Sequence, residues 1–373
     1  MNASYRPRTL DRVAALGLLA LALAACKQEY EINPEPVDVD PGDVTDCAFT
    51  RVEDTAFYRY DCNPVFTTTG EDWAPYVSAT AFSVTYVMDH PFYQLWYVAY
   101  DDDDSYAMGY AVSNNGTDWE PYPDNPVITQ DGAKPFERDV MQANQVVWDP
   151  SRNKYVMIYS GLDLTGGSDG GTGVLTSSDG MGWERIAANP VLWANDTDVD
   201  GLSGFCWPLD INLANEGYTG YISGSVGRSG ACEAFRLDGS SPAEWQVDGD
   251  VAFPAGDEGE WDDEGLISLN EAKLRGEHHL FYVGFGAWTN DGTVRYATNS
   301  YLGWARSEDG FDWEKEPEPV PIEMTEDGRV GAVAAVTVGS RIHLWVTDEY
   351  DDATGVGLFL YDPEAAAAED GAE

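Results

Sequence analysis

Residues 172–193 read TGVLTSSDGMGWERIAANPVLW, and this stretch carries the signals of one β unit. The run GVLTS is β-prone, as expected for a strand. Asp179-Gly180 predicts a turn, because an Asp side chain bonds the nearby backbone and Gly tolerates positive φ. Trp183 opens the next strand with a large apolar side chain, and Pro190 ends it because Pro cannot donate to a central ladder. The stretch therefore predicts two strands joined by a tight turn.

The same phrase recurs along the chain. Copies stand at residues 108–128 and 303–320, and a worn copy runs over residues 232–253. The anchoring tryptophans are 64, 62 and 68 residues apart, at Trp119, Trp183, Trp245 and Trp313. A second phrase, aromatic and β-branched, precedes each copy and occurs once more near the C-terminus; its copies begin at Leu95, Met157, Gly220, Leu280 and His343.

Five units imply one repeating body, because repeats stack their hydrophobic faces on one another. The lone Asn63-Pro64-Val65 indicates that the first and last fragments complete one unit between them. We predict an all-β fold over residues 47–363, a five-bladed β-propeller with four-stranded antiparallel blades. An antiparallel sandwich is the alternative, but it does not explain a five-fold repeat. The expected inner strands are Ala79–Val87, Asn144–Trp148, Asp210–Ala214, Leu269–Leu274 and Gly331–Val338.

The composition is globular but extremely acidic. The chain of 373 residues has 20 Lys and Arg against 66 Asp and Glu, a net charge of −46. Repulsion argues against nucleic acid and anionic membrane surfaces as partners. The acidity suits a solubilising surface or one that binds cations. We expect a monomer.

Residues 1–25 have the pattern of a signal peptide. A positive segment with three arginines precedes an apolar run over residues 13–24, which is too short to span a bilayer. The sequence Leu23-Ala24-Ala25-Cys26 resembles the lipobox of bacterial lipoproteins, which implies that Cys26 is lipidated and anchors the chain to a membrane. By the same resemblance Lys27 favours the outer membrane, on either side of it. The alternative is an ordinary secretory signal.

Two further segments flank the predicted propeller. Residues 26–46 are acidic and contain prolines, which indicates a flexible tether. Residues 364–373 indicate a frayed tail. Without Cys26 an even set of four cysteines remains, as expected for disulfides in an oxidising compartment. Three pairings are possible, and we favour the two local ones, Cys47–Cys62 and Cys206–Cys232.

The order of the phrases resembles a known family. An inner strand, an aromatic-Tyr phrase, Ser-x-Asp-Gly-x-x-Trp and Asn-Pro-Val follow one another, as in the five-bladed propeller glycoside hydrolases of families 32, 43 and 130. The resemblance covers most of residues 50–360. It implies the propeller fold and activity on glycosidic bonds, which requires two carboxylates flanking the bond.

An acidic residue stands near the start of each of the five expected inner strands: Asp72, Asp139, Asp200, Glu264 and Asp327. As catalytic candidates we take Asp139, Asp200 and Glu264, with Glu271 as an alternative to Glu264 for the general acid. Arg138 with Asp139 resembles the Arg-Asp motif of family 32, although Val140 replaces the usual Pro. The early Asp-Pro motifs and Glu-Cys-Pro of these families are missing, so no nucleophile or base can be carried over. The competing interpretation is that these acids are turn residues.

Two further features suggest ligands. Asp196, Asp198 and Asp200 alternate like the first half of a calcium loop, and oxygen ligands suit Ca²⁺; a solvated acidic turn is the alternative. Trp73, Trp207 and Trp288 fall in or near the expected mouth loops of the propeller, where their rings could stack on sugars or simply pack. No cofactor is required by the expected chemistry.

The sequence therefore predicts a tethered carbohydrate-active propeller that acts on an oligo- or polysaccharide. A non-catalytic propeller that binds glycan or protein, and a structural envelope lipoprotein, are the alternatives.

Overall fold

A computed structural model describes the part of the chain that forms the repeats. The described residues are 47–67, 73–74, 76–87, 92–100, 105–130, 135–162, 170–193, 202–214, 217–226, 231–290, 295–322, 330–350 and 353–364. Residues 47–373 form a compact unit distinct from residues 1–46. Within the described residues no helix is long and apolar enough to cross a membrane.

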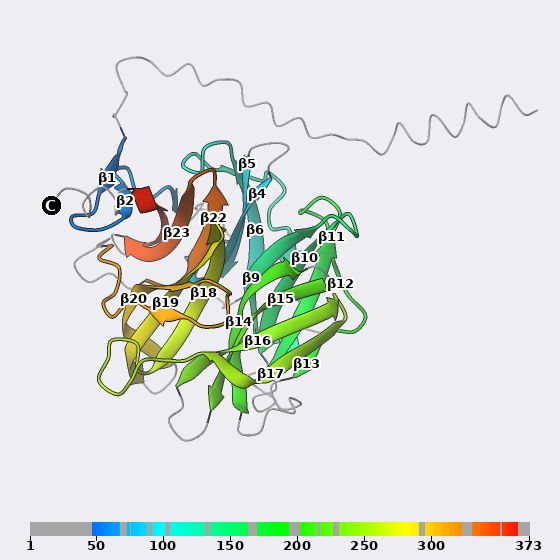
Figure 1. Ribbon diagram of the computed structural model, residues 1–373. Helices are drawn as coiled ribbons and strands as arrows, with labels where there is room; N and C mark the ends of the chain where they lie inside the picture. The colour runs from blue at the N-terminus through cyan, green and yellow to red at the C-terminus, as the bar shows by residue number, and fades with distance from the viewer. Residues whose placement is uncertain are drawn as a thin grey trace, which may run out of the picture. The chain divides into compact units, whose positions relative to one another are not determined.

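The described chain is built from five antiparallel blades (Figure 1). Blade I comprises β4 (Tyr76–Val87), β5 (Phe92–Tyr100), β6 (Tyr106–Ser113), β7 (Glu120–Pro121) and β8 (Ile128–Thr129). Blade II follows the short 3-10 helix η1 (Pro135–Glu137) and comprises β9 (Val140–Asp149), β10 (Lys154–Leu162), β11 (Gly171–Ser177), β12 (Trp183–Arg185) and β13 (Leu192–Trp193).

Blades III and IV share one ladder. Blade III comprises β14 (Leu202–Ala214), β15 (Gly217–Val226), β16 (Cys232–Ser241) and β17 (Glu244–Phe253). Blade IV comprises β18 (Gly265–Leu274), β19 (Glu277–Asn290), β20 (Arg295–Ser307) and β21 (Glu314–Lys315). A single parallel pair, Cys232 with Gly265, joins them.

Blade V closes the ring with both ends of the described chain. It contains β22 (Val333–Val338), β23 (Arg341–Tyr350) and β24 (Ala353–Tyr361) from the C-terminal end, and β1 (Phe49–Arg51), β2 (Phe57–Tyr60) and β3 (Phe66–Thr67) from the N-terminal end. Both β2 and β3 pair with β24, so the first and last fragments complete one blade, as predicted. Figure 1 shows blue β2 beside red and orange strands.

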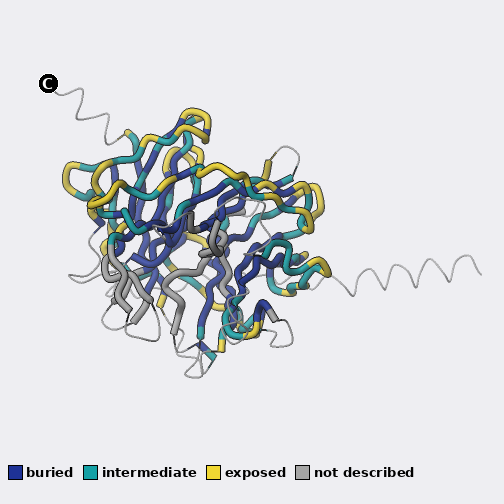
Figure 2. The backbone as a smooth tube through the Cα atoms, turned by 90° about the horizontal axis from the view of Figure 1, so that it is seen from below, coloured by how far each residue is buried: buried dark blue, intermediate teal, exposed yellow. Residues whose placement is uncertain are grey.

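Five hydrophobic clusters fill the five seams between neighbouring blades. They join blades V and I, I and II, II and III, III and IV, and IV and V, so the ring is closed. Most buried residues belong to strands, and Figure 2 shows that the exposed stretches lie mostly where the chain bends back on itself. The five predicted inner-strand cores fall in β4, β9, β14, β18 and, from Val333 on, β22. The predicted propeller is confirmed.

The outer strand of a blade is short because the repeat phrase interrupts it. In blades I and II it consists of two pieces on either side of a cis Asn-Pro bond. The Asn side chain pairs with the third strand like a backbone: Asn189 Oδ1 accepts from Val174 N at 2.8 Å and Nδ2 donates to Val174 O at 2.8 Å. Asn125 does the same on Tyr110, and Asn63 on Leu358.

The Ser-x-Asp-Gly phrase is a structural turn. Ser177 Oγ accepts from Gly180 N at 2.9 Å, and Asp179 Oδ1 accepts from the backbone of Met181 and Gly182. These backbone donors hold the pKa of Asp179 below its ordinary value, although burial opposes them. The turn also joins blades, because Trp96 of blade I donates to Gly180 O at 2.8 Å.

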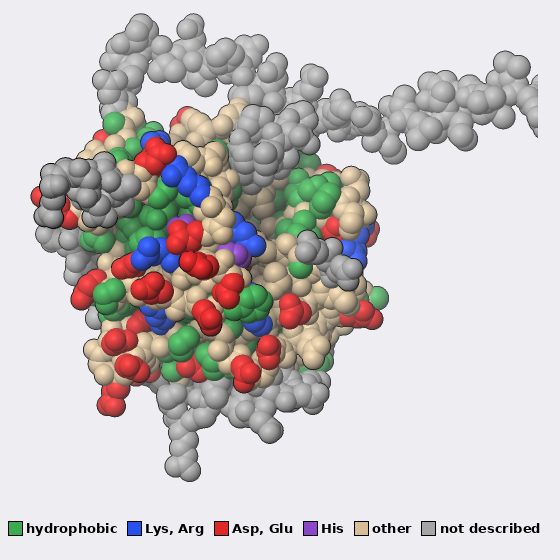
Figure 3. Space-filling view, viewed as in Figure 1, with side chains coloured by type: hydrophobic (Ala, Val, Ile, Leu, Met, Phe, Trp, Pro, Cys, Tyr) green, Lys and Arg blue, Asp and Glu red, His purple; other side chains and the backbone are tan. Residues whose placement is uncertain are grey.

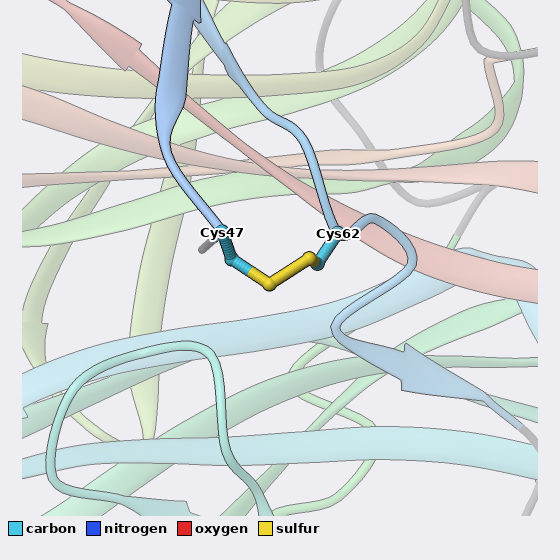
Figure 4. The surroundings of a disulfide bond; sticks show 2 residues. All are labelled: Cys47 and Cys62. Atoms are coloured by element: carbon cyan, nitrogen blue, oxygen red, sulfur yellow. A yellow bond between two sulfur atoms is a disulfide. The ribbon is translucent and has the colours of Figure 1, made fainter. Parts of the chain in front are cut away.

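The predicted local disulfide is confirmed. Cys47 and Cys62 are joined across the hairpin of β1 and β2, with Cα atoms 5.6 Å apart (Figure 4). Cys232 is also disulfide-bonded. The side chain of Cys206 lies outside the described residues, so the pairing Cys206–Cys232 stays a prediction.

Candidate functional site

The end of the propeller where the inner strands begin holds two of the predicted acids. Asp139 immediately precedes β9 and Glu264 immediately precedes β18, and both are half-buried. Each is anchored in the same way: Asp139 N donates to Leu162 O and Glu264 N to Phe285 O, both at 3.1 Å. Asp139 and Glu264 therefore occupy matching positions in blades II and IV.

The surroundings of Glu264 link two blades. Cys232 N of blade III donates to the Glu264 carbonyl at 3.2 Å, so the disulfide-bonded Cys232 lies beside the candidate acid. Arg138, next to Asp139, is exposed, and its own carbonyl accepts a hydrogen bond from Gln130 Nε2. At the starts of β9 and β18, each carboxylate is thus carried by a backbone that hydrogen bonds hold in place.

Glu271 lies far from Glu264. The two residues are seven positions apart on the same strand region, which corresponds to about 23 Å at a rise of about 3.3 Å per residue. Glu271 Oε1 is instead 2.6 Å from His278 Nδ1 of the neighbouring strand. The two catalytic carboxyl groups of a glycoside hydrolase lie within about 9.5 Å of each other, so Glu264 and Glu271 cannot form such a pair.

Several predicted residues fall outside the description. These are Asp196, Asp198 and Asp200, and the side chains of Trp207 and Trp288. Their proposed roles stay predictions. Within the described residues no cluster of three or more His, Cys, Asp or Glu side chains could hold a metal ion.

The predicted five-fold recurrence of an acid is not in register. In blade I Tyr76 pairs with Tyr100 as Val140 pairs with Leu162 and Gly265 with Phe285, so Tyr76 matches the residues that follow Asp139 and Glu264. The residue that precedes β4 in the sequence is Pro75, and the expected acid Asp72 is three residues before it and lies outside the described residues. Directly before the inner strand, blades II and IV therefore carry an acid and the sequence of blade I does not.

Buried acids two residues before the candidates were missed by sequence reasoning. Glu137 is fully buried, accepts from Tyr159 at 2.5 Å and pairs with Arg185 at 2.8 Å. Burial, followed by the negative charge of Glu137, raises the pKa of Tyr159. Blade IV repeats the arrangement with Asp262, Tyr282 and Lys315. A sequence signal for these buried acids did exist. An aromatic residue followed by an acid precedes the inner strand of blades II and IV, and a Trp-Glu-Arg or Trp-Glu-Lys sequence follows later in the same blade.

A third missed acid, Asp210, lies within inner strand β14. It is 1% exposed and accepts from Asn270 Nδ2 at 2.8 Å and from Glu271 N at 3.0 Å. Burial raises its pKa to about 8, while hydrogen bonds from the Glu271 and Ile211 backbone and from Asn212 oppose the rise. The nearby charge of Glu271 adds to the rise. Asp210 thus links blades III and IV.

Comparison with solved structures bears on the fold. A thermostable family-43 glycoside hydrolase matches with a TM-score of 0.56 and 15% identity, covering 79% of this chain and 91% of that one. A glycosyl hydrolase from Bacteroides ovatus matches with a TM-score of 0.56 and 16% identity, covering 85% and 94%. The chain has the fold of the propeller glycoside hydrolases.

The glycoside hydrolase fold is also shared with a larger enzyme. The family-32 β-fructofuranosidase of Bombyx mori matches with a TM-score of 0.54 and 16% identity, and the match covers 79% of this chain and 60% of that one. No protein-family model matches the sequence, and no curated protein matches it. At these identities the likeness establishes the architecture, while activity has to be argued from the side chains.

Proposed function

We propose that this protein acts on glycosidic bonds of an oligo- or polysaccharide by carboxylate acid/base catalysis. The observation that carries the proposal is the matching position of Asp139 and Glu264, at the starts of two inner strands in a glycoside hydrolase fold. Asp200, which directly precedes Gly201 and β14, is the third carboxylate of the proposed set.

We propose two catalytic roles for these three carboxylates. Glu264, half-buried beside Cys232, is the general acid that protonates the leaving glycosidic oxygen. Asp139 or Asp200 is the ionised partner, which either activates water or attacks the anomeric carbon. Water then supplies the hydroxyl that replaces the leaving group. No step needs a cofactor beyond these carboxylates.

Hydrolysis of a panel of oligosaccharides, measured as new reducing ends, tests the proposal. Glu264→Gln and Asp139→Asn should each lower kcat by about 10²- to 10⁴-fold, the usual contribution of general acid/base catalysis. Glu258→Gln is the matched control, because Glu258 is exposed in the loop that precedes Glu264. Undiminished hydrolysis by both active-site variants would sink the assignment of these residues.

A non-catalytic saccharide-binding propeller is the second candidate. The observation that favours it is that blade I has Pro75 directly before its inner strand, where blades II and IV carry an acid. This candidate predicts saccharide binding by the native protein with no new reducing ends from any substrate in the panel. The same assay, combined with calorimetric binding, therefore distinguishes the two functions.

We also propose that the protein is tethered to the bacterial outer membrane through a lipid on Cys26. The support is the sequence Leu23-Ala24-Ala25-Cys26 after a short apolar run, followed by Lys27. Metabolic labelling with a radioactive fatty acid should label the native chain and not Cys26→Ser. A native chain that stays unlabelled and is released into the soluble fraction would contradict the tether.

The loop from Asp196 to Asp200 is proposed to bind Ca²⁺ through its alternating carboxylates. A bound ion stabilises the folded state by mass action. Calcium chloride should therefore raise Tm relative to EDTA in the native protein, and the increase should vanish in Asp198→Asn. Equal Tm values with and without calcium would remove the ion from the account.

A further inference from the structure

An ion pair fills the outer seam in front of blade II. Arg185, two residues after Trp183, reaches buried Glu137 at 2.8 Å and donates to Thr129 O of blade I at 2.8 Å. Phe136 lies over Tyr159, with ring centroids 6.0 Å apart. The pair thus occupies the space between the aromatic layer of blade II and the outer strand of blade I.

Blade IV fills the same position with the same chemistry. Lys315, two residues after Trp313, lies 2.9 Å from buried Asp262. Trp261 stacks on Tyr282 with centroids 5.6 Å apart, as Phe136 does on Tyr159. The strand register shows that Lys315 and Arg185 are equivalent, because Lys315 pairs with Ala305 and Arg185 pairs with Leu175. Ala305 and Leu175 each lie two residues after the glycine that contacts the Tyr ring of their blade.

Blade I has lost both partners of this pair. Trp73 lies over Tyr97 with centroids 6.1 Å apart, so Ala74 takes the position of Glu137 and Asp262. Pro121 pairs with Ala111 in the same register, so it takes the position of Arg185 and Lys315. The acid and the cation are absent together, so neither of these two positions leaves a buried charge without its partner.

The space is open in blade I. A groove of about 420 Å³ lies between β3 of blade V and the outer part of blade I. Its walls include Phe66, Trp73, Trp119, Pro121, Tyr122 and Pro123. None of the described residues that line it is charged, although 23% of the chain is charged. The volume is within the range of about 300–1,000 Å³ that is typical of ligand sites.

The half-buried rings of the groove are held from behind. Trp73 packs on fully buried Tyr97, Trp119 on fully buried Trp345 at 6.2 Å between centroids, and Tyr122 on buried Tyr110 at 6.3 Å. Each wall ring is therefore fixed before a ligand arrives, which lowers the ordering cost of binding. Thr67, exposed at the edge, adds a hydroxyl.

We propose that this groove, whose described lining includes none of the candidate carboxylates, is a second binding site that holds an uncharged saccharide. A sugar ring offers C–H faces that pack on aromatic faces and hydroxyls that stay in water at the open side. The described residues of the wall give a charged ligand no counter-ion, and the net charge of −46 repels polyanionic glycans. The choice of a saccharide rests on the proposed function.

Affinity electrophoresis of the full native chain through gels that contain a soluble polysaccharide tests the site. The probes are xylan, arabinan, galactan and inulin, with polygalacturonate as the charged comparison. Ala74→Glu combined with Pro121→Arg restores the ion pair of blade II and fills the groove. Tyr122→Ala removes one wall ring without adding a charge. Phe311→Ala is the control, because Phe311 is an aromatic residue 69% exposed in a blade IV turn outside the groove.

At least one neutral probe should retard the native chain and Phe311→Ala equally. Tyr122→Ala should bind that probe about tenfold more weakly, as expected for the loss of one ring contact. The filled variant, checked for native Tm, should bind it still more weakly. Undiminished binding by Tyr122→Ala or by a folded filled variant, retardation by polygalacturonate alone, or no retardation by any neutral probe would overturn the site.

The outcomes separate this site from the proposed function. Hydrolysis that depends on Glu264, together with undiminished polysaccharide binding by the groove variants, would remove the groove and leave the enzyme. Groove-dependent binding without any hydrolysis would remove the enzyme and leave the groove.

Discussion

Asp210 shows how a single buried carboxyl connects blades around the propeller axis. It accepts from Asn270 Nδ2, and Asn270 Oδ1 in turn accepts from Ala335 N of blade V at 2.7 Å. On the other side of the ring Ser83 Oγ of blade I accepts from Val146 N of blade II at 3.1 Å. Inner strands of neighbouring blades are thus joined by side chains, because most of them share no ladder.

The raised pKa of Asp210 predicts a pH-dependent contribution to stability. With a folded pKa of about 8 against 3.8 unfolded, its contribution is fully present below about pH 4 and is lost as pH rises through 8. Asp210→Asn should cost about 1–3 kcal/mol of unfolding free energy at pH 5, because its NH₂ would face buried donors. The deficit should shrink by pH 9. A deficit that stays constant in urea unfolding between pH 5 and 9 would contradict the raised pKa.

The ion pair Arg185–Glu137 predicts that removing the cation alone lowers the free energy of unfolding more than removing both partners does. Arg185→Met leaves Glu137 buried without a cation and should cost about 3–5 kcal/mol. Adding Glu137→Leu should recover part of that loss, because the double variant has no unpaired buried charge. The free energies from a double-mutant cycle in urea decide this, and simple additivity would refute the coupling.

In blades I, II and IV the second and third strands approach each other closely at a Tyr-Gly pair. Tyr97 faces Gly109, Tyr159 faces Gly173 and Tyr282 faces Gly303 across the ladder. A Cβ on Gly173 would lie 2.3 Å from the Tyr159 ring. The glycine in the repeat phrase is therefore needed for the close approach of the ring.

This pair predicts that Gly173→Ala destabilises the fold. Overpacking of a buried ring should cost about 1–3 kcal/mol and lower Tm. Gly249→Ala is the matched control, because a Cβ there meets no atom within 4 Å, and its Tm should stay within the error of the native value. Equal Tm values for the two variants would show that the ring moves aside without cost.

The repeated sequence motifs allowed the strands to be predicted, but they revealed much less about the candidate site. Turns, strand alternation and the Asn-Pro-Val ends follow from local signals in residues 172–193 and its copies. Glu137, Asp262 and Asp210 escaped prediction because their importance comes from partners on other strands, such as Arg185 and Asn270. Sequence order places an acid near a strand start, but the register between blades decides which acid is buried.

At the scale of the whole molecule, N-terminal strands close the ring. Asn63 pairs with Leu358, 295 residues away, and β2 completes the blade of β24. Figure 3 shows acidic side chains spread over the face in view, with fewer basic ones among them. Such an excess of one charge favours solubility, because the molecules repel one another.

The disulfide Cys47–Cys62 bridges the N-terminal hairpin that closes the ring, so we expect it to stabilise this closure. The bridge spans 15 residues, and a loop of that size is worth about 3 kcal/mol in the chain-entropy model. Cys47→Ser with Cys62→Ser should lower the unfolding free energy by that order. It should also speed hydrogen exchange in β2 and β24 more than in β10. Uniform exchange in all blades would show that this segment does not hold the ring closed.

The central claim is that carboxylates at the starts of inner strands act on a glycosidic bond. The measurement that tests it most directly is the separation of the carboxyl groups of Asp139, Asp200 and Glu264 in a crystal structure with a bound oligosaccharide. Glu264 should lie about 5–9.5 Å from one of the other two, with a glycosidic oxygen between them. Carboxyl groups more than about 12 Å apart, or a saccharide bound only in the groove at Trp119, would contradict it.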